Sequence, residues 1–280
     1  MTAALTAFAL VAFAANSLLC RMALGTSAID AASFTSIRLA SGAAALLVLG
    51  RLSSGRHHSP GPPWRSAIAL FAYALSFSLA YESLETGTGA LVLFGSVQAT
   101  MLGAALATGE RPRRQEWVGL ALAAVGLVYL VFPGLTAPPL GGSALMTVSG
   151  ISWGCYSLWG RRATDPIGDT ALNFTRGLPL AVLVSLATVG RANVSAPGAM
   201  LAVLSGALAS GLGYVVWYYA LPRLTATRAA TVQLAVPVLA AVGGVAVLSE
   251  GVSLRLFVSG LLILGGVALA SSSNVSAEAP

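Results

Sequence analysis

The sequence has little charge, and it contains no lysine. Charged residues make up 9% of the 280 residues, whereas a soluble globular domain carries roughly 25%. Hydrophobic residues account for 56%. So few charges cannot cover the surface of a soluble fold, but they suit a protein whose outer surface is solvated by lipid. The composition therefore predicts an integral membrane protein with the lipid bilayer as its surroundings.

Other scarce residues narrow the function. The two histidines, His57 and His58, share one loop, and the two cysteines, Cys20 and Cys155, lie in or beside apolar runs, as small buried hydrophobes do. The 15 arginines form scattered pairs rather than a basic tract, which argues against nucleic acid as a partner. The sequence holds no HExxH pattern, and its apolar runs hold no histidine and no pair of acids. We therefore expect no metal, no cofactor and no enzymatic activity.

Ten apolar runs divide the chain, and each is close to the length of about 20 residues that a helix needs to cross a bilayer core of about 30 Å. No separator between them is long enough to form a domain of its own. We interpret the first run as a retained span, because it lacks the basic segment that begins a signal peptide. The runs cover residues 2–20, 32–50, 65–83, 88–107, 115–132, 142–160, 170–189, 198–220, 226–248 and 254–271, and residues 272–280 are expected to be a disordered tail.

The arginines predict the orientation. If the N-terminus is cytoplasmic, ten arginines fall in cytoplasmic loops and only Arg21, Arg191 and Arg255 fall on the outer side. This distribution follows the positive-inside rule, so both termini are predicted to be cytoplasmic in a multi-pass protein of the bacterial inner (plasma) membrane. The remaining two, Arg38 and Arg176, fall inside runs.

A pattern of polar residues recurs at half the length of the chain. The intervals between its members are 4, 17, 72 and 9 residues in the first half and 4, 15, 74 and 10 in the second. The matches pair Ser17 with Ser157, Arg21 with Arg161, Arg38 with Arg176, Glu110 with Glu250 and Gly119 with Gly260. Five matches in order predict an internal duplication, with repeats at residues 1–135 and 140–271.

The number of runs determines how the two repeats are oriented relative to each other in the membrane. Each repeat holds five, an odd number, so the second must be inverted relative to the first. Inverted repeats are typical of secondary transporters, which bind substrate near the bilayer midplane between the halves. The predicted fold is therefore all-α, with ten transmembrane helices arranged as two inverted five-helix repeats around a central cavity.

With these features the sequence resembles the drug/metabolite transporter superfamily, in its EamA-type branch, over essentially the whole chain. The resemblance rests on the arginine in the second span of each half and on a fourth-span pattern that closes in Glu, from Ala90 to Glu110 and from Ala229 through Pro237 to Glu250. The family's proline usually recurs in both halves, whereas the first-half equivalent here is Val97. The aromatic-rich interior is similar to that of YddG-type exporters of aromatic amino acids.

Polar and aromatic residues within the runs are candidates to line the substrate path. Tyr73, Phe77 and Tyr81 form one stripe at i, i+4 and i+8. Such stripes alternatively serve packing or, near span ends as for Tyr81, an interfacial belt. A buried amide bonds either a neighbouring helix or a solute. The candidates are Asn16, Ser17, Phe77, Tyr81, Phe94, Gln98, Trp153, Tyr156, Ser157, Tyr214, Trp217 and Gln233, with Pro237 as a hinge at a predicted kink.

Charged residues within the runs give two further expectations. Arg38 and Arg176 each cost about 3 kcal/mol or more in a bilayer, so each either holds its half together or binds a substrate carboxylate. Their symmetric recurrence favours the structural role. No Asp or Glu lies in the middle third of any run, and proton-coupled pumps carry such an acid. We therefore expect uncoupled facilitated diffusion or exchange.

Together these observations predict a secondary transporter for small amphipathic metabolites that works by alternating access as a monomer or weak dimer. Its substrates are expected to be amino acids, aromatic and hydrophobic ones included, exported across the inner membrane. One alternative is a proton-coupled efflux protein for drugs or toxic compounds. An alternative of another class is a channel or a structural membrane protein.

Overall fold

The computed structural model describes residues 2–52, 61–107, 114–132, 137–161, 163–224, 229, 232–233 and 235–272. Over these residues the regular secondary structure is helical, with one isolated antiparallel bridge between Ile29 and Val194. The prediction of an all-helical protein is confirmed for this part of the chain. The predicted tail covers residues 272–280; of these, Ser272 ends a helix, and residues 273–280 lie outside the described residues, as does Glu110.

The helices follow the predicted runs closely. The first half contributes α1 (Thr2–Leu24), α2 (Ala31–Leu52), α3 (Trp64–Tyr81), α4 (Thr86–Ala107) and α5 (Arg114–Val131). The second half contributes α6 (Leu140–Gly160), α7 (Pro166–Ala187), a continuous stretch of α8 (Ala196–Leu204), η2 (Ser205–Leu212) and α9 (Gly213–Ala220), then α11 (Ala235–Leu248) and α12 (Leu254–Ser272). Short 3₁₀ turns, η1 (Val189–Arg191) and η3 (Leu221–Arg223), follow α7 and α9.

One helix limit differs from the predicted runs for a local reason. α7 begins at Pro166 instead of residue 170, because the Asp165 side chain accepts the backbone N–H of Gly168 and proline suits the first helical position. Ala229, Val232 and Gln233 are helical, as is α11 from Ala235 onwards, so helical residues lie on both sides of Pro237. Residues 230, 231 and 234 lie outside the described residues, so the predicted kink at Pro237 remains a prediction.

Within the described residues, five stretches of helix are long and apolar enough to cross a membrane. They are Thr2–Leu24, Ala31–Leu52, Thr86–Ala104, Pro166–Ala187 and Ala196–Arg223. Shorter apolar helices cover Trp117–Leu130, Ala235–Leu248 and Leu254–Gly266. Large hydrophobic side chains such as Val48, Leu183 and Leu261 are exposed on the outside of the bundle. Such a surface fits lipid and not water, so the chain is a multi-pass membrane protein.

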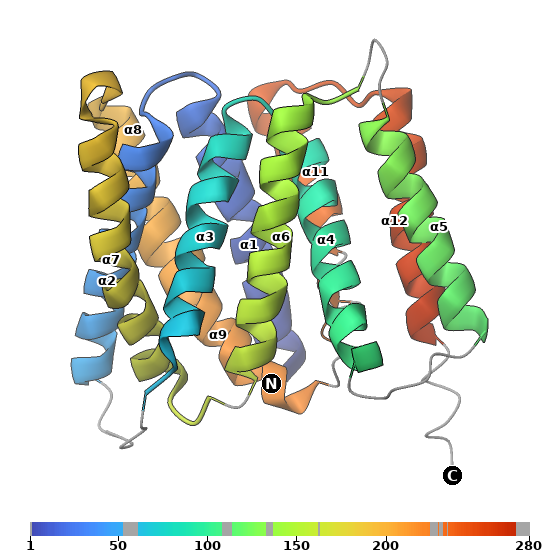
Figure 1. Ribbon diagram of the computed structural model, residues 1–280, viewed down its shortest axis with the longest axis horizontal. Coiled ribbons are helices and arrows are strands. Elements are labelled where there is room, and N and C mark those ends of the chain that lie inside the picture. Colours follow the sequence, from blue (N-terminus) through green and yellow to red (C-terminus); the bar gives the residue numbers. More distant parts are fainter. Residues whose placement is uncertain are drawn as a thin grey trace.

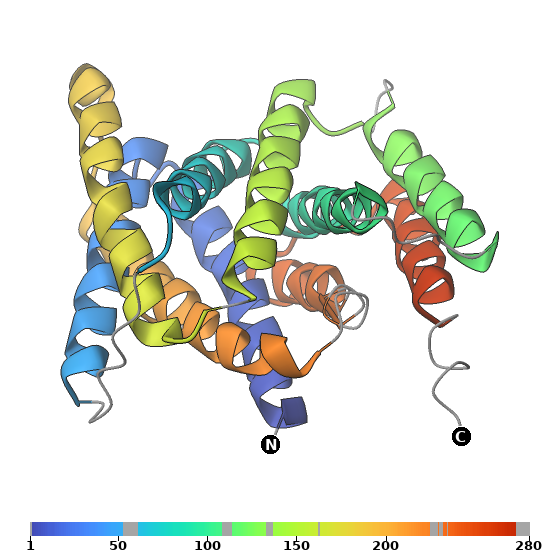
Figure 2. The same cartoon turned by 60° about the horizontal axis from the view of Figure 1, so that its bottom comes forward.

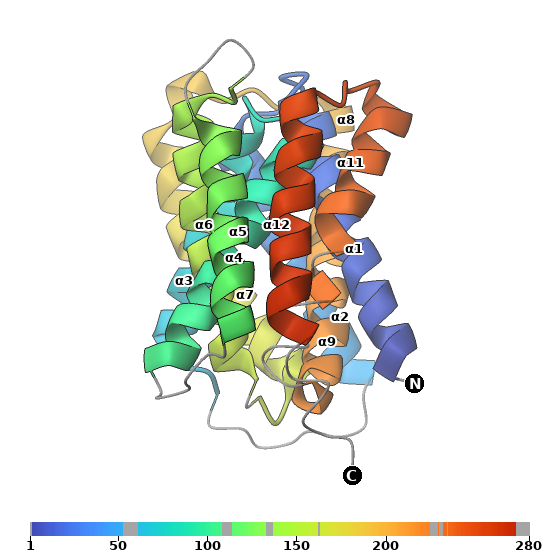
Figure 3. The ribbon, with the colours of Figure 1, turned by 90° about the vertical axis from the view of Figure 1, so that its right-hand side faces the viewer.

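The helices run up and down in one bundle (Figure 1). We call the end of the bundle where α1 begins the lower end, and the opposite end the upper end, as they lie in Figure 1. α12 ends at the lower end, where α1 begins. α5 and α12 pack along each other at one edge (Figure 3). α1 packs against α8, η2, α9 and α11, and it lies beside α9 in Figure 2.

The π-helical segment η2 is the main departure from the predicted runs. Residues 205–212 wind with i→i+5 hydrogen bonds in the middle of a predicted uninterrupted span. π-helical turns are rare and frequently lie at functional sites. Here the backbone packs closely on α2, because a Cβ added at Gly206 would lie 2.1 Å from the Arg38 carbonyl oxygen and 2.1 Å from Ser41 Oγ. Glycine thus allows η2 to approach α2 at the level of Arg38.

Candidate substrate site

Arg38 of α2 lies at the middle of the bundle, and only 1% of its surface is exposed. Its Nε donates a hydrogen bond to Ser210 Oγ over 2.9 Å. Its Nη2 donates to Tyr214 Oη over 2.8 Å and to Tyr73 Oη over 3.2 Å. One arginine of the first half therefore bonds two residues of the second.

The rest of the Arg38 guanidinium faces aromatic rings and has few polar partners. Its carbon lies 5.2 Å from the ring centroids of both Tyr73 and Phe77, within range of cation–π attraction. No carboxylate among the described residues forms an ion pair with it. Its buried Nη1 has no hydrogen-bond partner among those residues. An unsatisfied buried donor costs about 1–3 kcal/mol, and more when charged.

Asn16 of α1 completes the polar part of this region. Its Nδ2 donates to Tyr73 Oη over 3.2 Å. Its Oδ1 accepts from Ser205 Oγ over 2.6 Å and from Ser210 Oγ over 3.4 Å. Tyr214 Oη also donates to Tyr73 Oη over 3.1 Å. We call this connected group the polar centre; it consists of Asn16, Arg38, Tyr73, Ser205, Ser210 and Tyr214.

The winding of η2 explains how Ser205 and Ser210 reach the same amide. In an α-helix, residues five apart point in different directions, since each residue advances about 100°. The i→i+5 winding of η2 turns both hydroxyls towards α1. Sequence reasoning missed both serines, because α-helical spacing does not connect them.

Aromatic rings close one side of the polar centre. Phe13 of α1 meets Trp153 and Trp217 edge to face, with centroid distances of 5.3 and 5.7 Å. Trp153 lies 4.6 Å from Tyr214 and 5.1 Å from Tyr73 between ring centroids. These rings form a tightly packed apolar surface beside the guanidinium of Arg38. Phe13 was not predicted, because one phenylalanine in an apolar run carries no signal of its own.

All twelve predicted lining residues are buried. The structure brings six of them into or next to the polar centre: Asn16, Phe77, Trp153, Tyr214, Trp217 and Gln233. Gln233 Oε1 accepts the indole N–H of Trp153 over 3.2 Å, and its Nε2 donates to the Ala229 carbonyl over 3.0 Å. This amide therefore bonds neighbouring protein groups, one of the two expected alternatives.

Tyr81 and Tyr156 pack against the rings of Phe77 and Trp153, on the side away from the polar centre's hydrogen bonds. Tyr81 donates to the Thr86 carbonyl over 3.4 Å at the upper end, and Tyr156 accepts from Asn173 Nδ2 over 3.4 Å. Because Tyr81 is fully buried, an interfacial belt does not describe it. Ser17, Phe94, Gln98 and Ser157 are buried as well.

Arg176 differs from its sequence match Arg38. It is only partly buried, donates from Nη1 to the Pro62 carbonyl, and lies 4.9 Å from the Trp64 ring centroid. It thus reaches from α7 towards the start of α3, as a snorkelling side chain does. The two arginines recur symmetrically in the sequence, but their surroundings in the fold are not symmetric.

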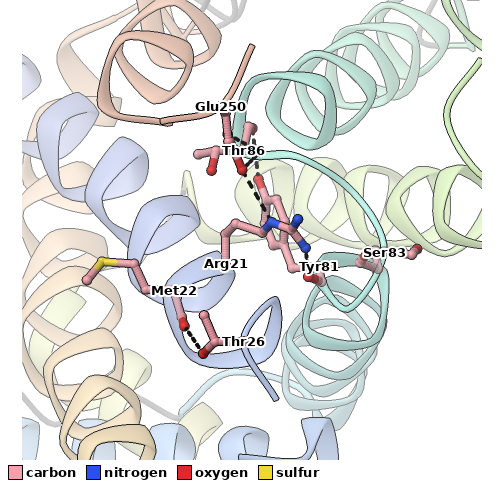
Figure 4. Close-up of polar contacts among 8 residues, drawn as sticks. Arg21, Met22, Thr26, Tyr81, Ser83, Thr86 and Glu250 are labelled. Carbon is pink, nitrogen blue, oxygen red and sulfur yellow. Dashed lines mark hydrogen bonds and ion pairs between the residues drawn. The ribbon is translucent and has the colours of Figure 1, made fainter. Parts of the chain in front are cut away.

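A second polar cluster ties the two halves together at the upper end (Figure 4). Arg21 Nε lies 3.2 Å from Glu250 Oε1, and Arg21 Nη1 donates to the Tyr81 carbonyl over 3.1 Å. The backbone N–H of Thr86 donates to both Glu250 oxygens, over 2.9 and 3.1 Å. We call these four residues the upper clasp. It joins α1, the end of α3, the start of α4 and the segment after α11.

The sequence match of Arg21, Arg161, makes a comparable contact at the lower end. Its Nη2 donates to the Leu224 carbonyl over 3.2 Å, just after η3. Both arginines therefore bond a carbonyl at the end of corresponding helical stretches, α3 and α8–α9. The sequence match of Glu250 is Glu110, which lies outside the described residues.

A pocket of about 470 Å³ opens beside the upper clasp. Its lining includes Glu85 and Thr88 of the first half and Pro139 and Arg255 of the second. Burial raises the pKa of the Glu85 carboxyl, Glu250 raises it further, and Arg21 lowers it in part. The pocket does not include the polar centre.

Comparison with known proteins places this geometry in context. The profile of the EamA-like transporter family matches residues 140–272. An uncharacterized protein of Pseudomonas aeruginosa is 53% identical over 272 residues, which cover 96% of this chain and 93% of that protein. A probable amino-acid metabolite efflux pump of Salmonella typhimurium is 24% identical over 71% of this chain and 72% of its own length.

A solved crystal structure shares the fold. It aligns with a TM-score of 0.65 over 98% of this chain and 99% of its own, at 22% sequence identity. An uncharacterized transporter of Archaeoglobus fulgidus is 27% identical over 75% of this chain and 76% of its own length.

Proposed function

Because the chain belongs to the EamA-like transporter family, we propose that it is a secondary transporter which exports small amphipathic metabolites, amino acids above all, across the bacterial inner membrane. The fold proposed for this activity has ten spans in two inverted halves, with both termini in the cytoplasm. The similarity to the probable amino-acid metabolite efflux pump of Salmonella typhimurium supports the substrate class.

The observation that carries the proposal is the polar centre itself. Arg38, Tyr73 and Asn16 come from the first half and Ser205, Ser210 and Tyr214 from the second, and their hydrogen bonds cross between the halves. Polar groups at membrane depth are expensive and usually mark substrate pathways. Secondary transporters built from repeats bind substrate where the repeats meet. The polar centre is the proposed binding site.

Alternating access is the proposed mechanism, and the upper clasp supports it. Arg21 of the first half and Glu250 of the second hold the upper end together. The repeat relates them to Arg161 and Glu110, so we propose that this second pair holds the lower end together in the opposite state. Pro237 is the proposed hinge of the ninth span. Opening one end would then require breaking one clasp while the other forms.

Transport is proposed to be uncoupled from protons. The acids of the described bundle lie towards its ends: Asp30, Glu82, Glu85 and Glu250 at the upper end, Glu116 in the first turn of α5, and Asp165 and Asp169 beside the start of α7. A proton-coupled pump usually carries an acid within its membrane-embedded site. The polar centre instead offers hydroxyls, an amide and a guanidinium.

Counterflow into proteoliposomes tests this function. Vesicles containing the purified protein would be preloaded with one unlabelled amino acid, and uptake of the same labelled amino acid would be followed at zero and at imposed pH gradients. We expect saturable acceleration by preloading and little effect of the gradient. A rate that collapses with an uncoupler would favour proton-coupled efflux, and unsaturable flux without counterflow would favour a channel.

A further inference from the structure

Arg38 carries a positive charge in the middle of the bundle, and the described residues around it offer neutral oxygens only. Its hydrogen bonds go to two tyrosine hydroxyls and one serine hydroxyl. We infer that Arg38 binds the carboxylate of the transported substrate, so that the protein takes amino acids and other monocarboxylates and rejects their amide and amine analogues. This inference rests on the proposed function and specifies its substrate class.

The hydrogen bonds of the polar centre show a surplus of donors. Three donors converge on Tyr73 Oη: Arg38 Nη2, Asn16 Nδ2 and Tyr214 Oη. A phenolic oxygen has two lone pairs at most to receive them. The two N–H groups of Arg38 Nη1 add further donors, and no described residue accepts from them. What this region lacks is an acceptor.

A carboxylate is the acceptor that matches this surplus. It offers two oxygens and about four lone-pair sites, and its planar shape fits the fork of a guanidinium. It also brings one negative charge, which balances the single charge of Arg38. A phosphate dianion would leave an excess negative charge among neutral hydroxyls, which is costly away from water.

The rest of the substrate is defined by the aromatic rings beside Arg38. Phe77 lies under the guanidinium at 5.2 Å, and Trp153 and Phe13 lie next to Tyr73 and Tyr214. An apolar or aromatic side chain attached to the carboxylate-bearing carbon would contact these rings. The arrangement therefore favours hydrophobic amino acids over polar ones.

Arg176 offers an internal comparison, because it shares the sequence position but not the surroundings. It lies against Pro62 and Trp64 towards the lower end. A substrate with one carboxylate needs one arginine, and of these two only Arg38 belongs to the polar centre. Arg176→Gln is therefore the matched control for Arg38→Gln.

The experiment compares four ligands that differ only in their polar groups: L-phenylalanine, L-phenylalaninamide, 3-phenylpropionate and phenethylamine. Each would be tested for thermal stabilisation of the purified protein and for competition in counterflow. We expect the two carboxylates to bind and the two compounds without a carboxylate to bind about 10- to 100-fold more weakly, since a charge-assisted pair is lost. Arg38→Gln should remove this difference, whereas Arg176→Gln should keep it.

Several outcomes would overturn the inference. Equal binding of L-phenylalanine and its amide would do so, even if both are transported, and the proposed function would then stand. Preference for phenethylamine would do so as well. Equal stabilisation by chloride at matched ionic strength would show a simple halide site. If Arg38→Gln does not yield folded protein, the comparison of the four ligands on the unaltered chain still decides, and Arg38→Lys should show weakened discrimination because lysine lacks the fork.

Transport and the carboxylate site are tested separately. Counterflow of any small solute supports the transporter, whichever group that solute carries. A protein that exchanges amines or neutral solutes but no carboxylate would confirm transport and refute the role of Arg38. A protein that binds carboxylates selectively without exchanging them would keep the site and refute the transporter.

Discussion

Arg21 and Glu250 stand 229 positions apart in the sequence, yet Arg21 Nε lies 3.2 Å from Glu250 Oε1. The side chains are 22% and 11% exposed, so water screens this pair less than it screens an ordinary surface pair. Glu250 also accepts the backbone N–H of Thr86, which has to find an acceptor at the start of α4. One carboxylate therefore serves two donors from the opposite half.

Removing that carboxylate should destabilise the protein. We expect Glu250→Ala to lower stability by about 1–3 kcal/mol, because a partly buried guanidinium and a backbone N–H lose their acceptor. Glu250→Gln should cost less, since its amide oxygen can still accept. Thermal unfolding in detergent measures both, with Arg191→Met as a control at an exposed arginine of the same end. An unfolding temperature of Glu250→Ala equal to that of the unaltered chain would contradict the role of the clasp.

The same change should open the upper end, and a native cysteine reports it. Cys20 precedes Arg21 and is fully buried, so a membrane-impermeant maleimide should label it slowly. In a Cys155→Ala background, which leaves Cys20 as the single thiol, Glu250→Ala should raise the labelling rate several-fold. Labelling would be followed in intact cells or sealed vesicles. Unchanged labelling of Cys20 would mean that the clasp does not control access.

Asp30 should give a pH-dependent contribution to stability. Burial raises the pKa of its carboxyl, but hydrogen bonds from the backbone N–H groups of Ser33 and Asn193 outweigh burial and lower it below its ordinary value of 3.8. A lowered pKa means that the folded state favours the carboxylate. The stabilisation is therefore complete above the unfolded-state pKa and is lost as pH falls through the lower folded-state pKa.

Asp30→Ala should thus cost about 1–2 kcal/mol at pH 7, as loss of a helix-capping residue does. The difference from the unaltered chain should shrink as the pH is lowered below about 4, because the unaltered chain then loses the same contribution. Unfolding temperatures between pH 7 and pH 3 provide the measurement. A difference that stays constant over this range would show that Asp30 does not act as a carboxylate.

Gly206→Ala should disrupt the packing of η2 on α2. An added Cβ would lie 2.1 Å from the Arg38 carbonyl oxygen, which is backbone and cannot rotate away. Overpacking of this kind costs about 1–3 kcal/mol or more, and here it would also displace Arg38. We expect lower thermal stability and weaker binding of carboxylates. Gly141→Ala in α6 is the matched control, because nothing lies within 4 Å of the position of its Cβ.

Much of the fold could be predicted because the bilayer imposes simple rules. Helix length follows from membrane thickness, and each of the ten predicted runs falls on helical structure. Burial of Asn16, Gln233 and Arg38 was also predictable, since polar groups avoid lipid and turn inwards.

Other features depend on contacts that no local pattern contains. Arg38 and Arg176 share a sequence position, but only the packing of η2 on one side and of α3 on the other decides which is buried. The upper clasp joins two members of the repeat pattern that the sequence places in different pairs, Arg21 with Arg161 and Glu110 with Glu250. In the structure Arg21 of the first half forms an ion pair with Glu250 of the second half, although each matches a different residue in the sequence pattern.

The π-helical segment η2 lies where the two halves of the chain differ in length. Between the paired arginine and the paired glutamate, the second half is two residues longer than the first, 74 against 72. η2 lies within that interval, and its wider winding absorbs additional chain length without a loop. If the same eight residues wound as an ordinary α-helix, Tyr214 and Trp217 would be rotated by about 100° around the helix axis, because each residue of an α-helix advances about that far. The π-helical winding therefore keeps the side chains beyond it directed at the polar centre in spite of the longer chain.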